Sequence, residues 1–256
     1  MTKTITRHTL RAGTPRLPVA VLGLVALLFA APAAFAQTAP PLGVAGQFGV
    51  LGNSAVTGSA GAGTMVTGDV GSSPTSIINN FGPSTVVGGF TLHNAVVPDG
   101  TTNQARTDAN LAGGNLFGQL AGSTLLVDPF PAGITSLVPG KYNFTTTATL
   151  PGGSTLNFNG NGVWVINVGS ALTTINTSNM TLSGGANACN IFWRIGSSAT
   201  IDSANFFGTV IAVADITLNA GNVTGRLLAG TGASGAVTMA TGGNTIGGCS
   251  SAPVIP

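Results

Sequence analysis

Few side chains in this sequence could carry acid–base or metal chemistry. All six acidic residues are aspartates spread singly along the chain, whereas a glycoside hydrolase needs two carboxylates at one site. Beyond residue 36, His93 is the single histidine, too few for a catalytic triad or a histidine metal cluster. We therefore interpret His93 as a solvated loop residue and Asp69 as a corner residue that binds nearby backbone amides. The sequence predicts a protein without enzymatic activity, metal or cofactor.

Threonines at one repeated position form a different kind of candidate site. They lie in short strands where apolar and polar residues alternate, so the threonines point away from the core. If these strands stack in register, the threonines form one outward column between two others. The central column contains Thr149, Thr173, Thr200, Thr217 and Thr238. The second column contains Thr147, Ala171, Ser198, Asp215 and Ala236, and a less regular third contains Ile175, Asp202, Asn219 and Ala240.

Such a surface is flat, nearly uncharged and made of small hydroxyl and methyl groups. Stacked strands repeat at about 4.7–4.9 Å, close to the oxygen repeat of hexagonal ice. Because threonine is stiff at χ1, its methyl and hydroxyl groups lose little entropy when they order water. The pattern favours a surface that binds ice. The alternative is that threonine is simply a good strand residue whose cross-strand pairs stabilise the sheet, and for any single threonine that alternative is stronger.

The threonine strands belong to a cycle of three strands that recurs along the C-terminal half. An apolar strand such as Val163–Val168 comes first, the threonine strand follows, and a third short strand such as Asn222–Thr224 closes the cycle. Three strands per cycle predict a mostly β fold, a triangular, discontinuous β-solenoid. Earlier coils fit the same template within residues 142–158 and, more loosely, within residues 48–70.

One segment has helical periodicity instead. From Thr102 to Leu120, small and apolar residues recur at helical spacing, and Thr101 or Thr102 could cap the start. Interior glycines each cost about 1 kcal/mol relative to alanine, so this helix needs a surface to pack on. The first strands offer one, because they are apolar on both faces. We therefore expect one long α-helix packed alongside the solenoid, with Trp164 and Trp193 buried beneath it.

The first 36 residues have the pattern of an export signal. Basic residues precede the apolar run Val19–Phe29 and the small-residue cleavage site Ala34-Phe35-Ala36. The run is too short for a membrane anchor. We predict removal of residues 1–36, a single domain over residues 37–256, and a monomer in the extracellular space or the periplasm. Without the leader, four basic residues minus six aspartates give a net charge of −2, which argues against nucleic acid as a partner.

Six stretches match the pattern of a known family, and they occur in the family's order. They are Leu42–Thr57, Val66–Pro74, Leu137–Phe144, Ala186–Ile201, Val223–Ala229 and Asn244–Ile246. In these stretches the chain resembles the bacterial and fungal ice-binding proteins built as an irregular β-solenoid with a flanking helix. The resemblance implies adsorption to the ice crystal surface, thermal hysteresis and inhibition of ice recrystallisation, without enzymatic activity.

The resemblance also adds candidate residues beyond the columns. Some members of the family carry a Thr-(Ala/Gly)-x-(Thr/Asn) motif on the ice-binding face. The segment from Thr241 to Asn244 matches this motif, whereas Asn219–Asn222 and Asp202–Asn205 depart from it at the threonine. We therefore expect Thr241 and Asn244 to contact ice together with the columns.

Two questions stay open at this point. Cys189 and Cys249 would lie about 14 Å apart if the coils stacked in sequence order, too far for a disulfide, which needs Cα atoms within ~7 Å. They pair only if the coils stack out of order or the tail folds back. The function could also be surface adhesion, which an anchoring domain would favour, or carbohydrate chemistry, which paired acids and aromatic residues in one groove would favour.

Overall fold

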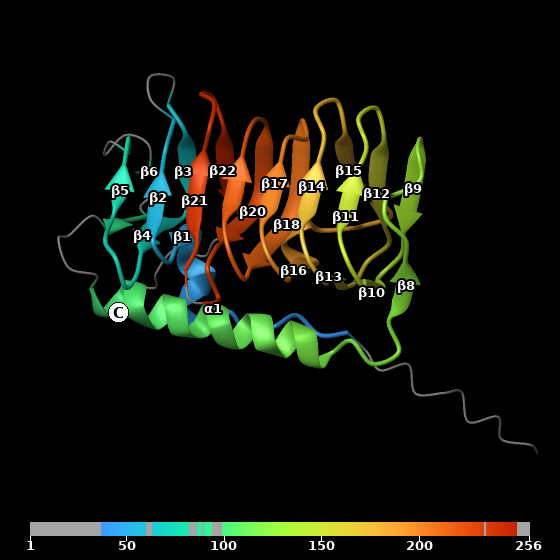
Figure 1. The fold of residues 1–256 in the computed structure, drawn as a ribbon, viewed down its shortest axis with the longest axis horizontal. Coiled ribbons are helices and arrows are strands. Elements are labelled where there is room, and N and C mark those ends of the chain that lie inside the picture. Colours follow the sequence, from blue (N-terminus) through green and yellow to red (C-terminus); the bar gives the residue numbers. More distant parts are fainter. Residues whose placement is uncertain are drawn as a thin grey trace, which may run out of the picture. The chain divides into compact units, whose positions relative to one another are not determined.

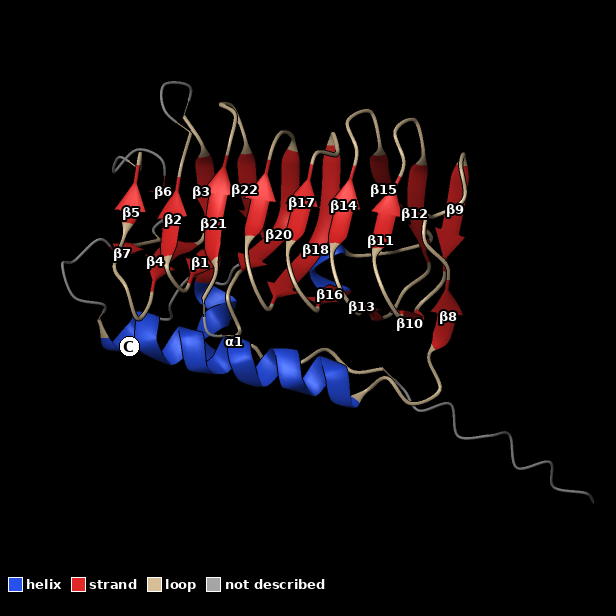
Figure 2. Cartoon of the chain, viewed as in Figure 1, coloured by secondary structure: helices blue, strands red, loops and turns tan. Residues whose placement is uncertain are grey.

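The structure, a computed structural model, describes residues 37–59, 63–81, 86–88, 90–93, 99–232 and 234–249. The predicted export signal lies outside these residues. Parallel strands wind into a three-sided solenoid, and one long helix, α1 (Gly100–Gly118), lies along it, as Figure 1 and Figure 2 show. The predicted fold class, a β-solenoid with a flanking helix, is confirmed.

The solenoid has three faces, which we name the threonine face, the helix-covered face and the third face. The threonine face is a seven-stranded sheet: β11 (Ala148–Leu150), β14 (Leu172–Thr174), β17 (Ala199–Ile201), β19 (Ile216–Leu218), β21 (Ala236–Met239), β2 (Ala55–Thr57) and β5 (Ile78–Asn79). The helix-covered face contains β8 (Thr124–Leu126), β10 (Gly140–Phe144), β13 (Trp164–Val168), β16 (Ile191–Ile195), β1 (Phe48–Gly52), β4 (Asp69–Ser72) and β7 (Leu92–His93). The third face contains β9 (Ile134–Leu137), β12 (Thr155–Asn159), β15 (Asn179–Ser183), β22 (Thr245–Gly248), β3 (Met65–Thr67) and β6 (Val86–Val87).

Two long strands, β18 (Asn205–Ala212) and β20 (Asn222–Leu228), belong to both the third face and the helix-covered face. They turn the corner at Gly208 and Gly225, which pair in register. Both glycines have positive φ, and a Cβ added to Gly225 would lie 1.8 Å from the carbonyl oxygen of Gly208. Adjacent coils therefore meet backbone to backbone at this corner, where a larger residue would not fit.

The coils do not stack in sequence order. β2 pairs with β21 and β1 pairs with β20, so the N-terminal coils lie on the C-terminal one. The N-terminal coils end at β7, and α1 then runs along the solenoid to β8, which starts the remaining coils at the opposite end (Figure 1). The helix thus carries the chain back from one end of the stack to the other. A short 3₁₀ turn, η1 (Gly43–Gln47), precedes β1 and contacts α1.

The helix packs on the sheet as predicted, but its bounds differ. It begins at Gly100, not Thr102, because Asp99 is the cap: its carboxylate accepts a hydrogen bond from the Thr102 amide at 2.8 Å. Neither Thr101 nor Thr102 caps the helix, and it ends at Gly118, short of the predicted end. Its buried stripe, Ala105, Ala109, Ala112 and Leu116, packs with the outward side chains Leu51, Val165, Phe192, Ile211 and Leu228.

The tryptophans lie inside the solenoid, which corrects their predicted place under the helix. Trp164 and Trp193 are fully buried and pack with aromatic residues of the third-face strands. The alternation of the strand decides this, because the neighbours Val165 and Phe192 point to the helix. Each indole N–H donates a hydrogen bond to a backbone carbonyl, which satisfies the buried polar group.

Cys189 and Cys249 form a disulfide, with Cα atoms 5.2 Å apart. The order of the coils makes this possible. Because β1 lies beside β20, the chain leaving β22 cannot continue on the helix-covered face, and the Arg226 guanidinium binds the carbonyl of Cys249. From the other side, the 3₁₀ turn η3 (Ala188–Asn190) reaches over β18 and β20.

Candidate functional site

The strands that carry the predicted threonines have a simple burial pattern. In β17, Ala199 and Ile201 are buried, and Thr200 between them is half-buried with its side chain pointing outward. The same pattern places a central threonine outward in β11, β14, β19 and β21. In β14 the inward position after the central threonine is Thr174, which is 1% exposed and accepts a hydrogen bond from the Asp202 amide at 2.9 Å. The inner side of the sheet is therefore packed and satisfied.

The predicted central column forms in the structure. Its threonines pair in register strand by strand: Thr149 with Thr173, Thr173 with Thr200, Thr200 with Thr217, and Thr217 with Thr238. The column also extends further than the sequence suggested. Thr57 of β2 pairs with Thr238, and Asn79 of β5 pairs with Thr57. The sequence did not reveal these two residues, because β2 stacks on β21 out of sequence order and β5 in turn stacks on β2.

The hydroxyl groups in the middle of this column are free to bind water. Within the described part of the chain, the hydroxyls of Thr173, Thr200, Thr217 and Thr238 have no hydrogen-bond partner in the protein. The strands that carry them contain no lysine, arginine or glutamate. Rows of hydroxyl and methyl groups at the strand spacing, with no charged residue within these strands, suit the ordering of water rather than the binding of an ion.

An aspartate closes one end of the threonine face. Asp128 accepts hydrogen bonds from the Thr147 hydroxyl at 2.6 Å and from the Thr149 amide at 2.5 Å. The amide of Phe130 donates to the carbonyl of Thr149 at 2.9 Å. These bonds occupy the edge of β11, which would otherwise be open to another strand. Thr147 and Thr149 therefore lie at the border of the surface, beside a carboxylate.

The second column lies at the corner with the helix-covered face. Thr147, Ala171 and Ser198 are half-buried and Asp215 is exposed. The column continues through Ala236, which pairs with Ala55 of β2. The Asp215 carboxylate accepts a hydrogen bond from the Ala236 amide at 2.7 Å, so this aspartate stabilises the corner as well as bordering the face.

The two ends of the predicted Thr-Gly-Gly-Asn motif differ in their exposure to solvent. Thr241 is exposed, and its hydroxyl donates to the carbonyl of Asn219, a half-buried residue of the third column. Asn244 is 1% exposed, and its amide donates to the carbonyl of Thr241 at 2.8 Å. This corrects the expectation that Asn244 lies on the surface. Its side chain instead holds the turn that displays Thr241.

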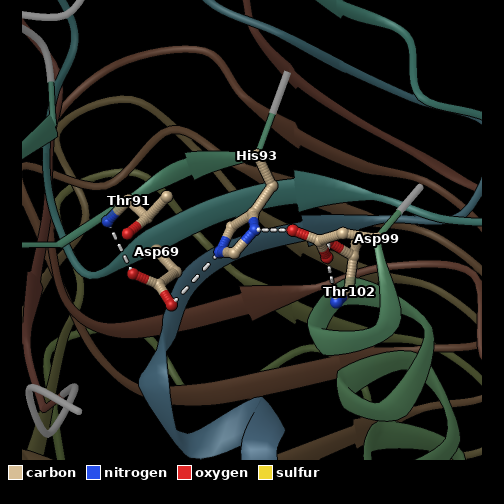
Figure 3. A network of polar contacts seen from close by, with 5 residues as sticks. All are labelled: Asp69, Thr91, His93, Asp99 and Thr102. Carbon is tan, nitrogen blue, oxygen red and sulfur yellow. Dashed lines mark hydrogen bonds and ion pairs between the residues drawn. The ribbon is translucent and has the colours of Figure 1, made fainter. Parts of the chain in front are cut away.

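A second polar cluster, formed by His93, Asp69 and Asp99, lies at the start of α1 (Figure 3). His93 is not a solvated loop residue: it belongs to β7, and its side chain is 9% exposed and stacks on Phe48. Its Nδ1 lies 2.6 Å from Asp99 and its Nε2 lies 3.3 Å from Asp69. The two aspartates, which looked isolated in the sequence, thus meet at one imidazole. Asp69 does bind a backbone amide, that of Thr91 at 2.7 Å, but this amide is 22 residues away and Asp69 begins strand β4, so it is not the local corner residue that was expected.

The charges of this cluster favour a protonated imidazole. Burial alone would lower the pKa of His93, but the bonds to Asp69 and Asp99 outweigh it and raise the pKa above its ordinary value. Burial would raise the pKa of Asp99, but hydrogen bonds from the Thr102 amide and from His93 lower it to about 2. The Thr102 hydroxyl donates to Asp99 at 2.7 Å. The cluster is thus a helix cap reinforced by an ion pair.

Comparison with known proteins identifies the family of this chain. A family model described as ice-binding-like matches residues 50–246. The chain belongs to this family. An ice-binding protein of Nostoc sp. (strain HG1) is 36% identical over 226 residues, covering 86% of this chain and 79% of that protein.

Solved structures of ice-binding proteins also share the fold of this ice-binding-like chain. One from an Antarctic biological consortium has a TM-score of 0.70 and 34% identity, and the match covers 83% of this chain and 92% of that one. Another, from the ascomycete Antarctomyces psychrotrophicus, has a TM-score of 0.66 and 33% identity over 82% and 98% of the two chains. The relatives are named for ice binding and not for an enzymatic reaction. Separately, no helix within the described residues is long and apolar enough to cross a membrane.

Proposed function

We propose that this protein adsorbs to ice crystals through the threonine face, and thereby gives thermal hysteresis and inhibits ice recrystallisation. The observation that carries the proposal is the in-register threonine column, whose middle hydroxyls have no partner among the described residues. Support also comes from relatives over most of the chain that are named ice-binding proteins. The partner is the ice surface, and the protein needs no cofactor for this contact.

The contact has a centre and a border. Its centre is Thr173, Thr200, Thr217 and Thr238, where the hydroxyls have no partner among the described residues and the strands pair in register. Its border consists of Thr57, Thr147, Thr149, Ala171, Ser198, Asp215, Asn219, Ala236 and Thr241. Water molecules held by the hydroxyls and fitted around the methyl groups would match the spacing of an ice plane, because adjacent strands repeat at about 4.7–4.9 Å. The stiffness of threonine at χ1 keeps both groups in place before contact.

A bulky residue at the centre of the face tests the proposal. We expect Thr200→Tyr to lift ice from the surface, so that purified protein no longer shapes a single ice crystal and thermal hysteresis falls sharply. The fold should survive, because the side chain of half-buried Thr200 points outward and surface substitutions change stability by about ±0.5 kcal/mol. Circular dichroism and the melting temperature verify that the variant is folded.

The matched control is Thr181→Tyr on the third face, which adds the same side chain to an equivalent half-buried strand position. It should leave ice shaping at the wild-type level. If the Thr181 variant loses ice shaping while the Thr200 variant keeps it, ice contacts the third face and not the threonine face. If wild-type protein does not shape ice at all, the proposed function fails as a whole.

Export with loss of residues 1–36, and the monomeric state, stay predictions from the sequence.

A further inference from the structure

The His93 cluster connects the solenoid strands β4 and β7 to the first turn of α1. Asp69 begins β4, His93 ends β7, and Asp99 caps α1. β7 is two residues long and pairs with β4 alone in the described part of the sheet. Few backbone hydrogen bonds therefore fix this last strand. The side-chain contacts of His93 add a bond between the solenoid and the first turn of the helix.

The contacts among the three side chains favour one protonation state of the imidazole. Each carboxylate already uses one oxygen for a backbone amide, Thr91 for Asp69 and Thr102 for Asp99, and turns the other oxygen to the imidazole. An ionised carboxylate only accepts hydrogen bonds, whereas a neutral imidazole carries a proton on one nitrogen only. In the neutral form one ring nitrogen would present its lone pair to a carboxylate oxygen. With both carboxylates ionised, only the doubly protonated imidazolium offers a proton to each of them: Nδ1 is hydrogen-bonded to Asp99, and Nε2 lies 3.3 Å from Asp69 as an ion pair without hydrogen-bond geometry.

We propose that His93 is a pH-sensitive clamp, which as an imidazolium fastens the start of α1 and strand β7 to the solenoid and which loosens when it loses its proton. The charged groups that face the ring are Asp69 from β4 and Asp99 from α1, and Phe48 of β1 packs on it without charge. Asp69 is buried, so loss of the proton would leave its carboxylate beside a neutral ring in a poorly solvated place. This inference is independent of the proposed ice-binding function.

The direction of the pH dependence follows from the raised pKa of His93. Stability contributed by a group whose pKa is raised on folding is fully present below the unfolded value, 6.5, and is lost as the pH rises through the folded value. The clamp is therefore closed below pH 6.5 and opens on the alkaline side. Asp99, with its pKa lowered to about 2, stays ionised throughout this range. No cysteine thiol adds to the titration in this window, because Cys189 and Cys249 form a disulfide.

An NMR titration combined with thermal unfolding tests the clamp. In the full protein, the imidazole resonance that disappears in His93→Gln should titrate with a pKa above 6.5. The wild-type melting temperature should fall by about 2–4 °C between pH 6 and pH 9, and the fall should vanish in His93→Gln. Amides at the start of α1, residues 102–106, should exchange hydrogen faster at pH 9 than at pH 6 in the wild type, after correction for the intrinsic pH effect on exchange.

Two further variants keep the test decisive. Asp202→Asn, an aspartate outside the cluster, should retain the wild-type fall in melting temperature. Asp69→Asn removes one facing charge and should lower the pKa of the His93 resonance, which gives a second measurement if His93→Gln does not fold. A His93 pKa at or below 6.5 in the wild type, or a His93→Gln variant with the wild-type pH dependence, would overturn the proposal.

Discussion

The threonine face and the third face are built from the same strand repeat, yet their polar side chains are used differently. On the third face, the Asn157 amide binds Ser136 and Ser183, and accepts a hydrogen bond from Thr181, each on a neighbouring coil. On the threonine face, the central hydroxyls have no protein partner among the described residues. Side chains that bond to one another stabilise the stack of coils, whereas side chains without partners leave their hydrogen bonds to water. The difference teaches that one strand repeat can either pair its outward polar groups between coils or leave them unpaired, and that only the unpaired groups keep their full hydrogen-bonding capacity for water.

The helix-covered face shows a third use of the same outward positions. One of its columns runs from Asn143, Asn167 and Arg194 to Ile211 and Leu228, because these residues pair strand by strand. The apolar end is buried under α1. At the polar end, the side chains bond along the column, and the Arg194 guanidinium lies 4.9 Å from the ring centre of a helix phenylalanine. Outward residue type thus decides whether a face is covered, self-paired or left open to solvent.

The largest effect should come from a charge placed under the helix. Ala109 is 1% exposed and lies in the stripe that packs on the sheet, so Ala109→Glu would bury an unpaired carboxylate and cost about 3 kcal/mol or more. Chemical denaturation measures this change in the free energy of unfolding. The matched variant on the open face, Thr200→Glu, should cost only about 0.5 kcal/mol. Equal costs for the two variants would show that position 109 is no better shielded from water than position 200, and hence that α1 is not packed on the sheet there.

A smaller effect should separate the two polar faces. Asn157→Ala removes the hydrogen bonds of the third-face ladder and should lower the free energy of unfolding by about 1 kcal/mol while leaving ice activity unchanged. Thr173→Ala should do the reverse, with little change in stability and a clear loss of thermal hysteresis. Urea unfolding and hysteresis measurements on both variants test this exchange. The comparison fails if the Asn157 variant loses ice activity or if the Thr173 variant is the less stable of the two.

The sequence predicts those features of the structure that neighbouring residues determine, and not those that depend on contacts between distant segments. The inward and outward sides of β17 follow from the alternation of Ala199, Thr200 and Ile201, which is why the threonine column was predicted correctly. Its continuation at Thr57 depends on the pairing of β2 with β21, and nothing near either strand encodes that the N-terminal coils stack on the C-terminal one. The disulfide at Cys189 could not be decided for the same reason.

The polar residues were harder to place, because their partners come from elsewhere in the fold. His93 was interpreted as a solvated loop residue because, as the single histidine beyond residue 36, it could not form a triad or a metal cluster. Its environment is made by Asp69 and Asp99 from other elements. Asn244 matched a surface motif, but the turn it closes required its amide inside. Periodicity therefore predicts which side of a strand faces outward, whereas it does not predict which polar group a tertiary contact will bury.

The smallest effect concerns the border of the threonine face, at the residue that the sequence did not reveal. Thr57 continues the central column beyond Thr238, and one more residue, Asn79, follows it. If ice contacts the column over its whole length, Thr57→Tyr should lower thermal hysteresis, but less than the same change at Thr217. A bulky group near one end of the column still lets ice contact the strands from β21 to β11. The melting temperature should change little, since the position is half-buried and outward. Hysteresis measured for both variants at equal concentration tests the gradient, with Thr245→Tyr on the third face as the control. Wild-type hysteresis in the Thr57 variant would place the end of the contact at β21, and a loss as large as that at Thr217 would move the centre of the contact towards the N-terminal coils.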